Sequence, residues 1–323
     1  MISDGQSAVR NHKFAMSDLI TAVELYKSFG HTRAVDGVSL TVRAGEAYGL
    51  VGPDGAGKTT TLRLLVGALK PDKGTVRVGG FDVQTQTEQA RAGLGYLAQR
   101  FSLYSDLTVI ENLRFFGEVR GVTGAALEKR AMELLRFVGL NGFEDRRAEQ
   151  LSGGMKQKLG LACALIHEPK VLLLDEPTGG VDPVTRQDFW QLIIRVLAQG
   201  AAVIVTTPYM DEAARCNRLG FMHSGRVLTE GSPREIAASM AGRVLELAAH
   251  PKATVKRVAL ADPDVEDVLA FGDRFHLRVK AVEGPLARLP GALTSAGASL
   301  DRLREVPASL EDAFISLLNK AEK

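Results

Sequence analysis

Two periods of hydrophobic and polar positions alternate along the chain, and they predict where strands and helices lie. Pieces with a period of two occupy residues 21–25, 34–35 and 38–42, and Gly30, Asp36, Gly37 and Gly45 separate them. This alternation is typical of short antiparallel strands. Unbroken apolar runs at 47–51, 171–174 and 201–205 predict strands buried on both faces. Together the patterns predict an α/β fold.

Between the first and second of those buried strands, the sequence predicts a short strand at 75–80 and a buried strand at 93–98, followed by helices. Apolar residues recur on one helical face within 107–120 and within 125–138, as Val109, Leu113 and Phe116 illustrate. We interpret residues 100–168, approximately, as an inserted helical subdomain.

Three parts of the chain follow from these patterns. Residues 1–18 have no apolar core and are expected to form a disordered N-terminal tail. Residues 19–238 hold the strands and helices described above, and residues 239–323 form a small accessory domain. In that last part, 244–247 and 274–279 alternate as strands, and Ser309 with Asp312 caps a helix, which predicts an α+β domain.

A glycine-rich segment lies where the first buried strand meets a helix. Its sequence is Gly52-Pro53-Asp54-Gly55-Ala56-Gly57-Lys58-Thr59-Thr60. Glycines let backbone N–H groups curl around an anion, and the following helix adds the positive end of its dipole. These features predict a P-loop in which Lys58 reaches the β- and γ-phosphates and Thr59 ligates Mg²⁺.

A second chemical signal ends the strand at 171–174, where Asp175 and Glu176 follow four apolar residues. The strand delivers both carboxylates to one edge of a sheet. Asp175 is expected to hold Mg²⁺, directly or through water, and Glu176 to polarise the attacking water.

Three further features have two interpretations when taken alone. Gln99 ends a predicted strand and is either a solvated polar residue or a ligand-contacting one. Phe29 stacks on a base or simply packs. Ser152 is a helix N-cap, and with Gly153 and Gly154 it forms either a second anion site or a plain capped helix.

Composition limits the classes of protein to which the chain can belong. The chain has 323 residues, 45% hydrophobic and 24% charged, which is ordinary for a globular protein. The net charge of +2 gives no evidence for a nucleic-acid partner. Cys163 and Cys216 have no metal or redox spacing. We expect no membrane-spanning helix, because no apolar window reaches 18 residues.

The order of these motifs closely resembles that in the nucleotide-binding domain of ATP-binding cassette (ABC) transporters. The motifs are the P-loop, Gln99, Leu151-Ser152-Gly153-Gly154, the Asp-Glu strand and Asp182. The resemblance covers roughly residues 19–238, and the P-loop, 151–164 and 209–213 are similar to the YbhF-type group of bacterial multidrug exporter ATPases. It implies a P-loop NTPase fold with a mixed-sheet core, an antiparallel β subdomain and an inserted helical subdomain.

The resemblance also implies how the sites work. Two chains form a head-to-tail homodimer on ATP, in which Lys58, Thr59 and Gln99 of one hold a nucleotide that Ser152, Gly153 and Gly154 of the other cover. Phe29 becomes the adenine-stacking aromatic, and Asp182 belongs to the loop that links the two sites. Thr59, Gln99 and Asp175 are the implied metal ligands, and Glu176, Lys58 and Gln99 the implied catalytic residues.

Two residues depart from the pattern of the family. Met155 stands where many cassettes have glutamine, and we expect little effect at a helix start. Pro208 stands where most have the histidine that contacts the γ-phosphate, and proline offers no side-chain donor. Since Glu176 remains, the expected ATP hydrolysis is slow but real.

The expected function is therefore the ATPase subunit of a multidrug-type exporter. It would drive a separate membrane permease from the cytoplasmic side, bound peripherally to the inner face of the cell membrane. The alternative is a soluble cassette ATPase that acts on ribosomes or DNA, although such relatives usually join two cassettes or carry a long coiled-coil insertion. A third alternative, a P-loop kinase or GTPase, would not explain the motif from Leu151 to Gly154. The C-terminal domain is expected to regulate or to stabilise the dimer.

Overall fold

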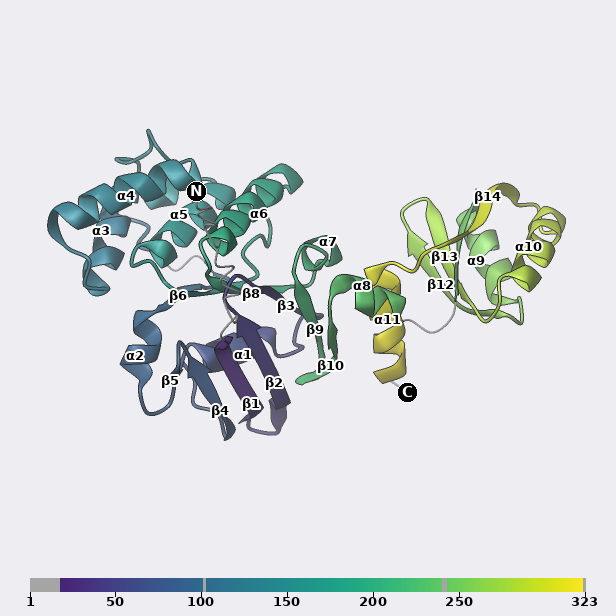
Figure 1. The fold of residues 1–323 in the computed structure, drawn as a ribbon. Helices are drawn as coiled ribbons and strands as arrows, with labels where there is room; N and C mark the ends of the chain where they lie inside the picture. The colour runs from purple at the N-terminus through teal and green to yellow at the C-terminus, as the bar shows by residue number, and fades with distance from the viewer. Residues whose placement is uncertain (1–17, 101–102, 240–242, 322–323) are drawn as a thin grey trace, which may run out of the picture. The chain divides into compact units, whose positions relative to one another are not determined.

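The computed structural model describes residues 18–100, 103–239 and 243–321. The predicted N-terminal tail lies outside these residues, apart from Asp18, which begins the first strand. The chain forms two compact units: one runs to Ala47 and resumes from Thr59 to Val205, and the other comprises Tyr48–Lys58 and everything from Thr206 onward. Figure 1 labels the elements.

The first unit opens with an antiparallel sheet in the strand order β2-β1-β4-β5. Its strands are β1 (Asp18–Phe29), β2 (Thr32–Arg43), β4 (Lys73–Val78) and β5 (Phe81–Asp82). The prediction of antiparallel strands before the P-loop is confirmed, but the expected break at Asp36 and Gly37 is wrong. These residues lie inside one long strand, where the pairing with β1 shifts between Leu25↔Val38 and Tyr26↔Asp36. The turn signals therefore mark a bulge, which bends a strand without ending it.

The same unit holds strands β8, β7 and β6 as successive neighbours, with β6 and β7 parallel. The strands are β6 (Leu94–Leu97), β7 (Val171–Asp175) and β8 (Ala202–Thr207). Its helices are α1 (Lys58–Leu65), α2 (Thr87–Ala92), α3 (Val109–Val119), α4 (Gly124–Val138), α5 (Gly153–Leu165) and α6 (Pro183–Ala198). A 3₁₀ turn, η1, covers Ala148–Gln150. Every residue of β7 is buried, as expected for a strand covered on both faces.

The second unit begins with β3 (Ala47–Val51), which pairs in parallel with β9 (Arg218–His223). Antiparallel β10 (Arg226–Gly231) completes the predicted hairpin with β9. Two short helices flank this hairpin in the sequence. Helix α7 (Met210–Ala213) precedes β9, and helix α8 (Pro233–Ala238) follows β10.

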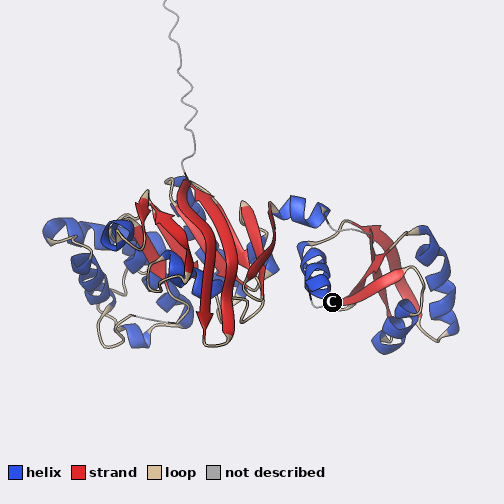
Figure 2. Ribbon diagram, turned by 90° about the horizontal axis from the view of Figure 1, so that it is seen from below, coloured by secondary structure: helices blue, strands red, loops and turns tan. Residues whose placement is uncertain are grey.

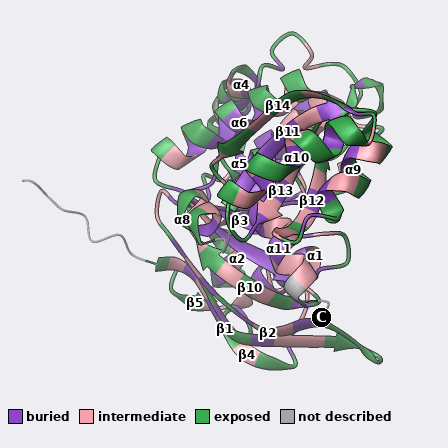
Figure 3. Ribbon diagram, turned by 90° about the vertical axis from the view of Figure 1, so that its right-hand side faces the viewer, coloured by how far each residue is buried: buried purple, intermediate pink, exposed green. Residues whose placement is uncertain are grey.

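The C-terminal part of the second unit is a four-stranded antiparallel sheet in the order β12-β13-β11-β14. The strands are β11 (Arg243–His250), β12 (Val265–Phe271), β13 (Arg274–Val279) and β14 (Ser299–Val306). Helices α9 (Lys252–Leu260) and α10 (Glu283–Ser295) cover one face, where Leu245, Leu277 and Leu293 belong to a common core. Figure 3 colours α10 with both exposed and buried residues, as expected for a helix with one face on the core.

The last helix, α11 (Leu310–Ala321), lies on the opposite face of that sheet (Figure 2). His276 Nδ1 lies 3.0 Å from the Asp312 carboxylate, and Arg278 donates to Ser316 at 2.9 Å. On the other side of the helix, Phe314 stacks against Phe221 of β9 with ring centroids 5.0 Å apart. The predicted Ser309–Asp312 cap forms through hydrogen bonds in both directions.

Candidate functional site

The P-loop joins β3 to α1. Some of its glycines have backbone angles that favour glycine, and another has no room for a side chain. Gly55 and Gly57 have φ angles of +78° and +105°, which residues with a side chain rarely adopt. A Cβ on Gly52 would collide with the backbone oxygen of Met222 in β9. The amide of Gly225 donates to the Ala56 carbonyl at 3.0 Å, so the β9–β10 turn supports the loop from behind.

Lys58 is the most enclosed charged residue of this loop, with 4% of its surface exposed. Its ammonium group donates to the backbone oxygens of Gly52 at 2.8 Å and Pro53 at 3.0 Å. These bonds hold the positive charge beside the N-terminus of α1, and the N-terminal end of a helix favours an anion through its backbone N–H groups and its dipole.

The chain places Thr59 and Asp175 in direct contact. The Thr59 hydroxyl donates to Asp175 Oδ1 at 3.1 Å, and Asp175 is 1% exposed at the end of β7. Among the described residues, no cluster of three His, Cys, Asp or Glu side chains could hold a metal alone. One hydroxyl and one carboxylate nevertheless fit Mg²⁺, because this ion usually keeps several waters and is shared with substrate phosphates.

Tyr96 is a residue of this site that the sequence analysis missed. Its hydroxyl donates to Asp175 Oδ2 at 3.4 Å. Burial, and then the Asp175 carboxylate, raise the pKa of Tyr96 to about 12, so the phenol stays a neutral donor at physiological pH. In the sequence, Tyr96 is one of several residues in the predicted buried strand. It reaches Asp175 only because β6 pairs with β7.

Gln99 and Glu176 also meet, which favours the ligand-contacting interpretation of Gln99. They follow the parallel neighbours β6 and β7, and Gln99 Nε2 donates to Glu176 Oε2 at 2.8 Å. Glu176 has a φ angle of +45°, a strained conformation for a residue with a side chain. Strain of this kind concentrates at functional sites, where it sets the direction of a side chain.

Ser152 and the two glycines after it begin α5. The Ser152 hydroxyl accepts from the Met155 amide at 3.3 Å, so it is the predicted N-cap. A Cβ on Gly154 would collide with Thr185, whereas a Cβ on Gly153 would meet nothing within 4 Å. Packing inside this chain therefore requires glycine at 154 but not at 153.

Asp182 has a structural contact that was not predicted. It caps α6 by accepting from the amides of Val184 at 3.1 Å and Thr185 at 3.0 Å, and from the Thr185 hydroxyl at 2.6 Å. Hydrogen bonds from Thr185 hold the pKa of Asp182 below its ordinary value. Since Thr185 also contacts Gly154, the starts of α5 and α6 are connected through one side chain.

Phe29 and Pro208 complete the set of predicted residues. The Phe29 ring is 50% exposed at the end of β1, with the Lys27 ammonium 5.8 Å from its centroid, so it is not a core residue. Before Pro208, the Thr207 hydroxyl donates to the buried Glu212 carboxylate at 2.6 Å and accepts from the Tyr209 amide at 3.0 Å.

Comparison with known proteins identifies the family. Residues 35–179 match the family described as "ABC transporter". The chain is 40% identical over 296 residues to the Nod factor export ATP-binding protein I of Paraburkholderia xenovorans, covering 91% of this chain and 95% of that protein. It belongs to the ABC transporter ATP-binding proteins.

Other relatives of this ABC protein agree with that assignment. It is 42% identical over 290 residues to a probable multidrug ABC transporter ATP-binding protein, YbhF of Escherichia coli, over 89% of this chain but only 50% of the relative's length. It also resembles a dimeric ATP-binding cassette solved in a post-hydrolysis state with ADP and Pi, with a TM-score of 0.62 and 27% identity over 66% of this chain and 98% of that one. The predicted P-loop NTPase fold is confirmed. No helix in the described ranges has the length and apolar character needed to span a bilayer.

Proposed function

We propose that this ABC protein is the ATP-binding and ATP-hydrolysing subunit of a bacterial exporter of the multidrug type. It would close as a head-to-tail homodimer on ATP and drive a separate integral membrane permease, to whose cytoplasmic side it binds. The observation that carries the proposal is the pairing of Thr59 with Asp175 and of Gln99 with Glu176 at the ends of β7 and β6. The names of the relatives favour export over action on ribosomes or DNA.

Binding of ATP would divide between two chains. In one chain, the amides of residues 52–60 and the Lys58 ammonium would hold the phosphates, while the exposed Phe29 ring would stack on adenine. Ser152 and Gly153 of the second chain would cover the same nucleotide. Their exposure and the open space at Gly153 leave room for it.

Thr59 and Asp175, with Gln99, are the residues that would hold Mg²⁺ together with the phosphates. When bound, the ion would neutralise the charge that develops on the phosphate oxygens. Tyr96 would keep the Asp175 carboxylate oriented through its neutral hydroxyl.

Glu176 is the proposed general base. Its carboxylate would accept a proton from the attacking water, whose oxygen bonds to the γ-phosphorus as the bond to ADP breaks. Gln99 would act as a positioning residue, because its amide already holds one oxygen of that carboxylate. Pro208 gives no side-chain donor to the γ-phosphate, so we expect hydrolysis to be slow but measurable.

The contact of Thr185 with both Gly154 and Asp182 offers a route between sites. When the nucleotide bound by the partner chain contacts the start of α5, the Thr185 side chain would transmit the change to the start of α6. This supports the proposed role of Asp182 in the loop that links the two nucleotides.

The test is the rate of phosphate release by the protein purified with its permease. Glu176→Gln should reduce the rate at least about 100-fold, the usual contribution of a general base, with ATP still bound. The matched control, Glu133→Gln on exposed α4, should retain the wild-type rate. Equal rates of phosphate release in wild type and Glu176→Gln would mean that the site binds ATP without hydrolysing it. Recovery of the protein with ribosomes instead of a permease would contradict export.

A further inference from the structure

The C-terminal part contains a hollow that none of the nucleotide-site residues line. It lies between α9 and the turn that joins β12 to β13, and its volume is about 830 Å³. Such a volume is within the usual range of small-molecule sites, about 300–1,000 Å³.

The lining is largely apolar, and its polar groups carry one sign of charge. Ala253, Leu260, Ala270 and Phe275 supply apolar surface, and the charged lining residues include no carboxylate. Leu260 is 52% exposed and adds to this apolar surface. The hollow therefore offers apolar contact that this part of the chain leaves open to solvent.

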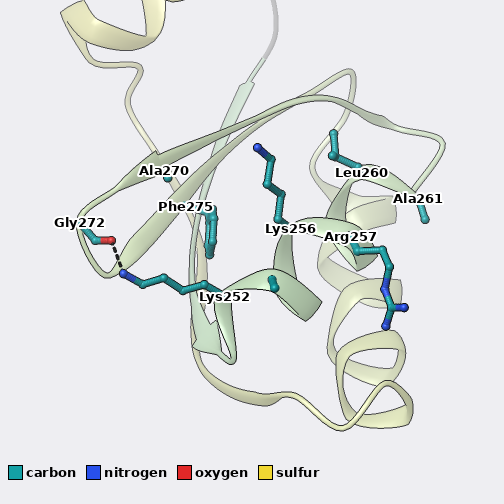
Figure 4. A pocket seen from close by; sticks show the side chains of 9 residues that line it. Lys252, Lys256, Arg257, Leu260, Ala261, Ala270, Gly272 and Phe275 are labelled. Atoms are coloured by element: carbon teal, nitrogen blue, oxygen red, sulfur yellow. Dashed lines mark hydrogen bonds between the residues drawn. The ribbon is translucent and has the colours of Figure 1, made fainter.

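Three cations of α9 line the hollow, Lys252, Lys256 and Arg257, and Figure 4 shows the Arg257 side chain turned away from Phe275. Lys252 donates to the backbone oxygen of Gly272 at 2.8 Å, which fixes its ammonium at the rim. Lys256, one helical turn later, extends between Phe275 and Leu260 and forms no ion pair with the described residues. The nearby acid of the turn, Asp273, lies 3.7 Å from Arg274 instead. A hydrogen-bonded cation and one without an ion pair among the described residues thus lie beside an apolar surface.

We propose that this hollow binds a small amphiphilic anion. A carboxylate or phosphate head would lie at the Lys256 ammonium, and an apolar chain or ring would cover Leu260 and the edge of Phe275. A soluble ligand is the occupant we expect, because the volume of about 830 Å³ matches that of a small-molecule site. The site would let a metabolite of this chemistry bind independently of nucleotide.

Calorimetric titration of the full-length protein with dodecanoate, below its micellar concentration, tests the proposal. We expect saturable binding with one ligand per chain. Decyltrimethylammonium should bind far more weakly because of its charge, and acetate because it lacks the chain. Lys256→Glu should raise the dissociation constant at least about fivefold, with Lys256→Gln between it and wild type.

Lys129→Glu is the matched control, since it makes the same charge change at an exposed position of α4. It should bind dodecanoate as the wild type does. Equal affinity of Lys256→Glu and wild type, binding of the cationic amphiphile as tightly as dodecanoate, or binding only to anionic vesicles would each overturn the proposal. Thermal unfolding of each variant checks that the fold is retained.

Discussion

The helices α1 and α5 both begin beside glycines, yet their surroundings differ. At α1, Gly52 is enclosed by β9 and Lys58 is 4% exposed, with its ammonium already bonded to the loop. At α5, Ser152 and Gly153 are exposed, and Gly153 faces open space. In the proposed account, the first helix start would be a complete cradle for phosphate, whereas the second would be half of a site. The difference explains why a single chain would bind ATP but need a second chain to enclose it.

The largest effect should come from the proposed phosphate cradle at α1. Lys58→Ala removes charge-assisted hydrogen bonds to phosphate, so nucleotide affinity of the single chain should fall about 10- to 100-fold. Titration with a fluorescent ATP analogue measures this, with Lys70→Ala at an exposed turn as the control. Gly153→Leu should leave this single-chain affinity unchanged. A similar loss in both variants would remove the distinction between the two helix starts.

Adjacent glycines of α5 allow the same substitution to be compared at two positions. Gly154→Leu places a side chain against Thr185 and should destabilise the protein by about 2 kcal/mol. Thermal and urea unfolding measure the change. Gly153→Leu should show no loss of stability, because its side chain would meet nothing within the chain. If the two variants unfolded alike, packing would not be the reason for glycine at 154.

The next effect concerns assembly rather than folding. On a Glu176→Gln background with ATP, Gly153→Leu should weaken the dimer about tenfold, since a leucine would stand where the partner's nucleotide must approach. Analytical ultracentrifugation over a range of protein concentrations gives the dissociation constant. An unchanged constant would mean that the start of α5 lies outside the interface.

The smallest effect is the pH dependence of Asp182. Hydrogen bonds, first from the Thr185 hydroxyl and then from its amide, lower the pKa of Asp182 below the ordinary 3.8. A group with a lowered folded-state pKa adds stability above its unfolded pKa, and this is lost as pH falls through the folded value. Asp182→Asn, which keeps an N-cap oxygen, should melt slightly lower than wild type at pH 7, and this difference should shrink as pH falls below the ordinary value of 3.8. A melting difference that is constant with pH would contradict this.

The sequence predicted the P-loop, the Asp-Glu strand and the cap at Ser152 because each is a local pattern. Lys58, Thr59 and Asp175 are recognisable from residue type and from their neighbours in the chain. Tyr96 was missed because its role depends on the pairing of β6 with β7, which no local pattern encodes. The Thr185 contacts with Gly154 and Asp182 likewise depend on the packing of two helices.

In the C-terminal part, local signals conflicted with tertiary packing. Helix α10 contains Pro290 and two glycines, which argue against a helix, yet Leu289 and Leu293 pack into the core and stabilise it. Strand β14 has no fully buried residue, so it lacks a clear alternation. The helix at Ser309 was predictable because its cap and its apolar face are both local.

Disulfide trapping between two differently marked chains tests the central claim most directly. One chain carries Asp54→Cys in the P-loop, the other Gly153→Cys, and both carry Glu176→Gln. Cys163 and Cys216 are buried, and burial raises their pKa, to about 12 for Cys216, so they should stay unreactive. The account predicts a cross-linked pair, one chain of each kind, that forms with ATP and not without it. Absence of this pair, or cross-links only between identical positions, would contradict the account.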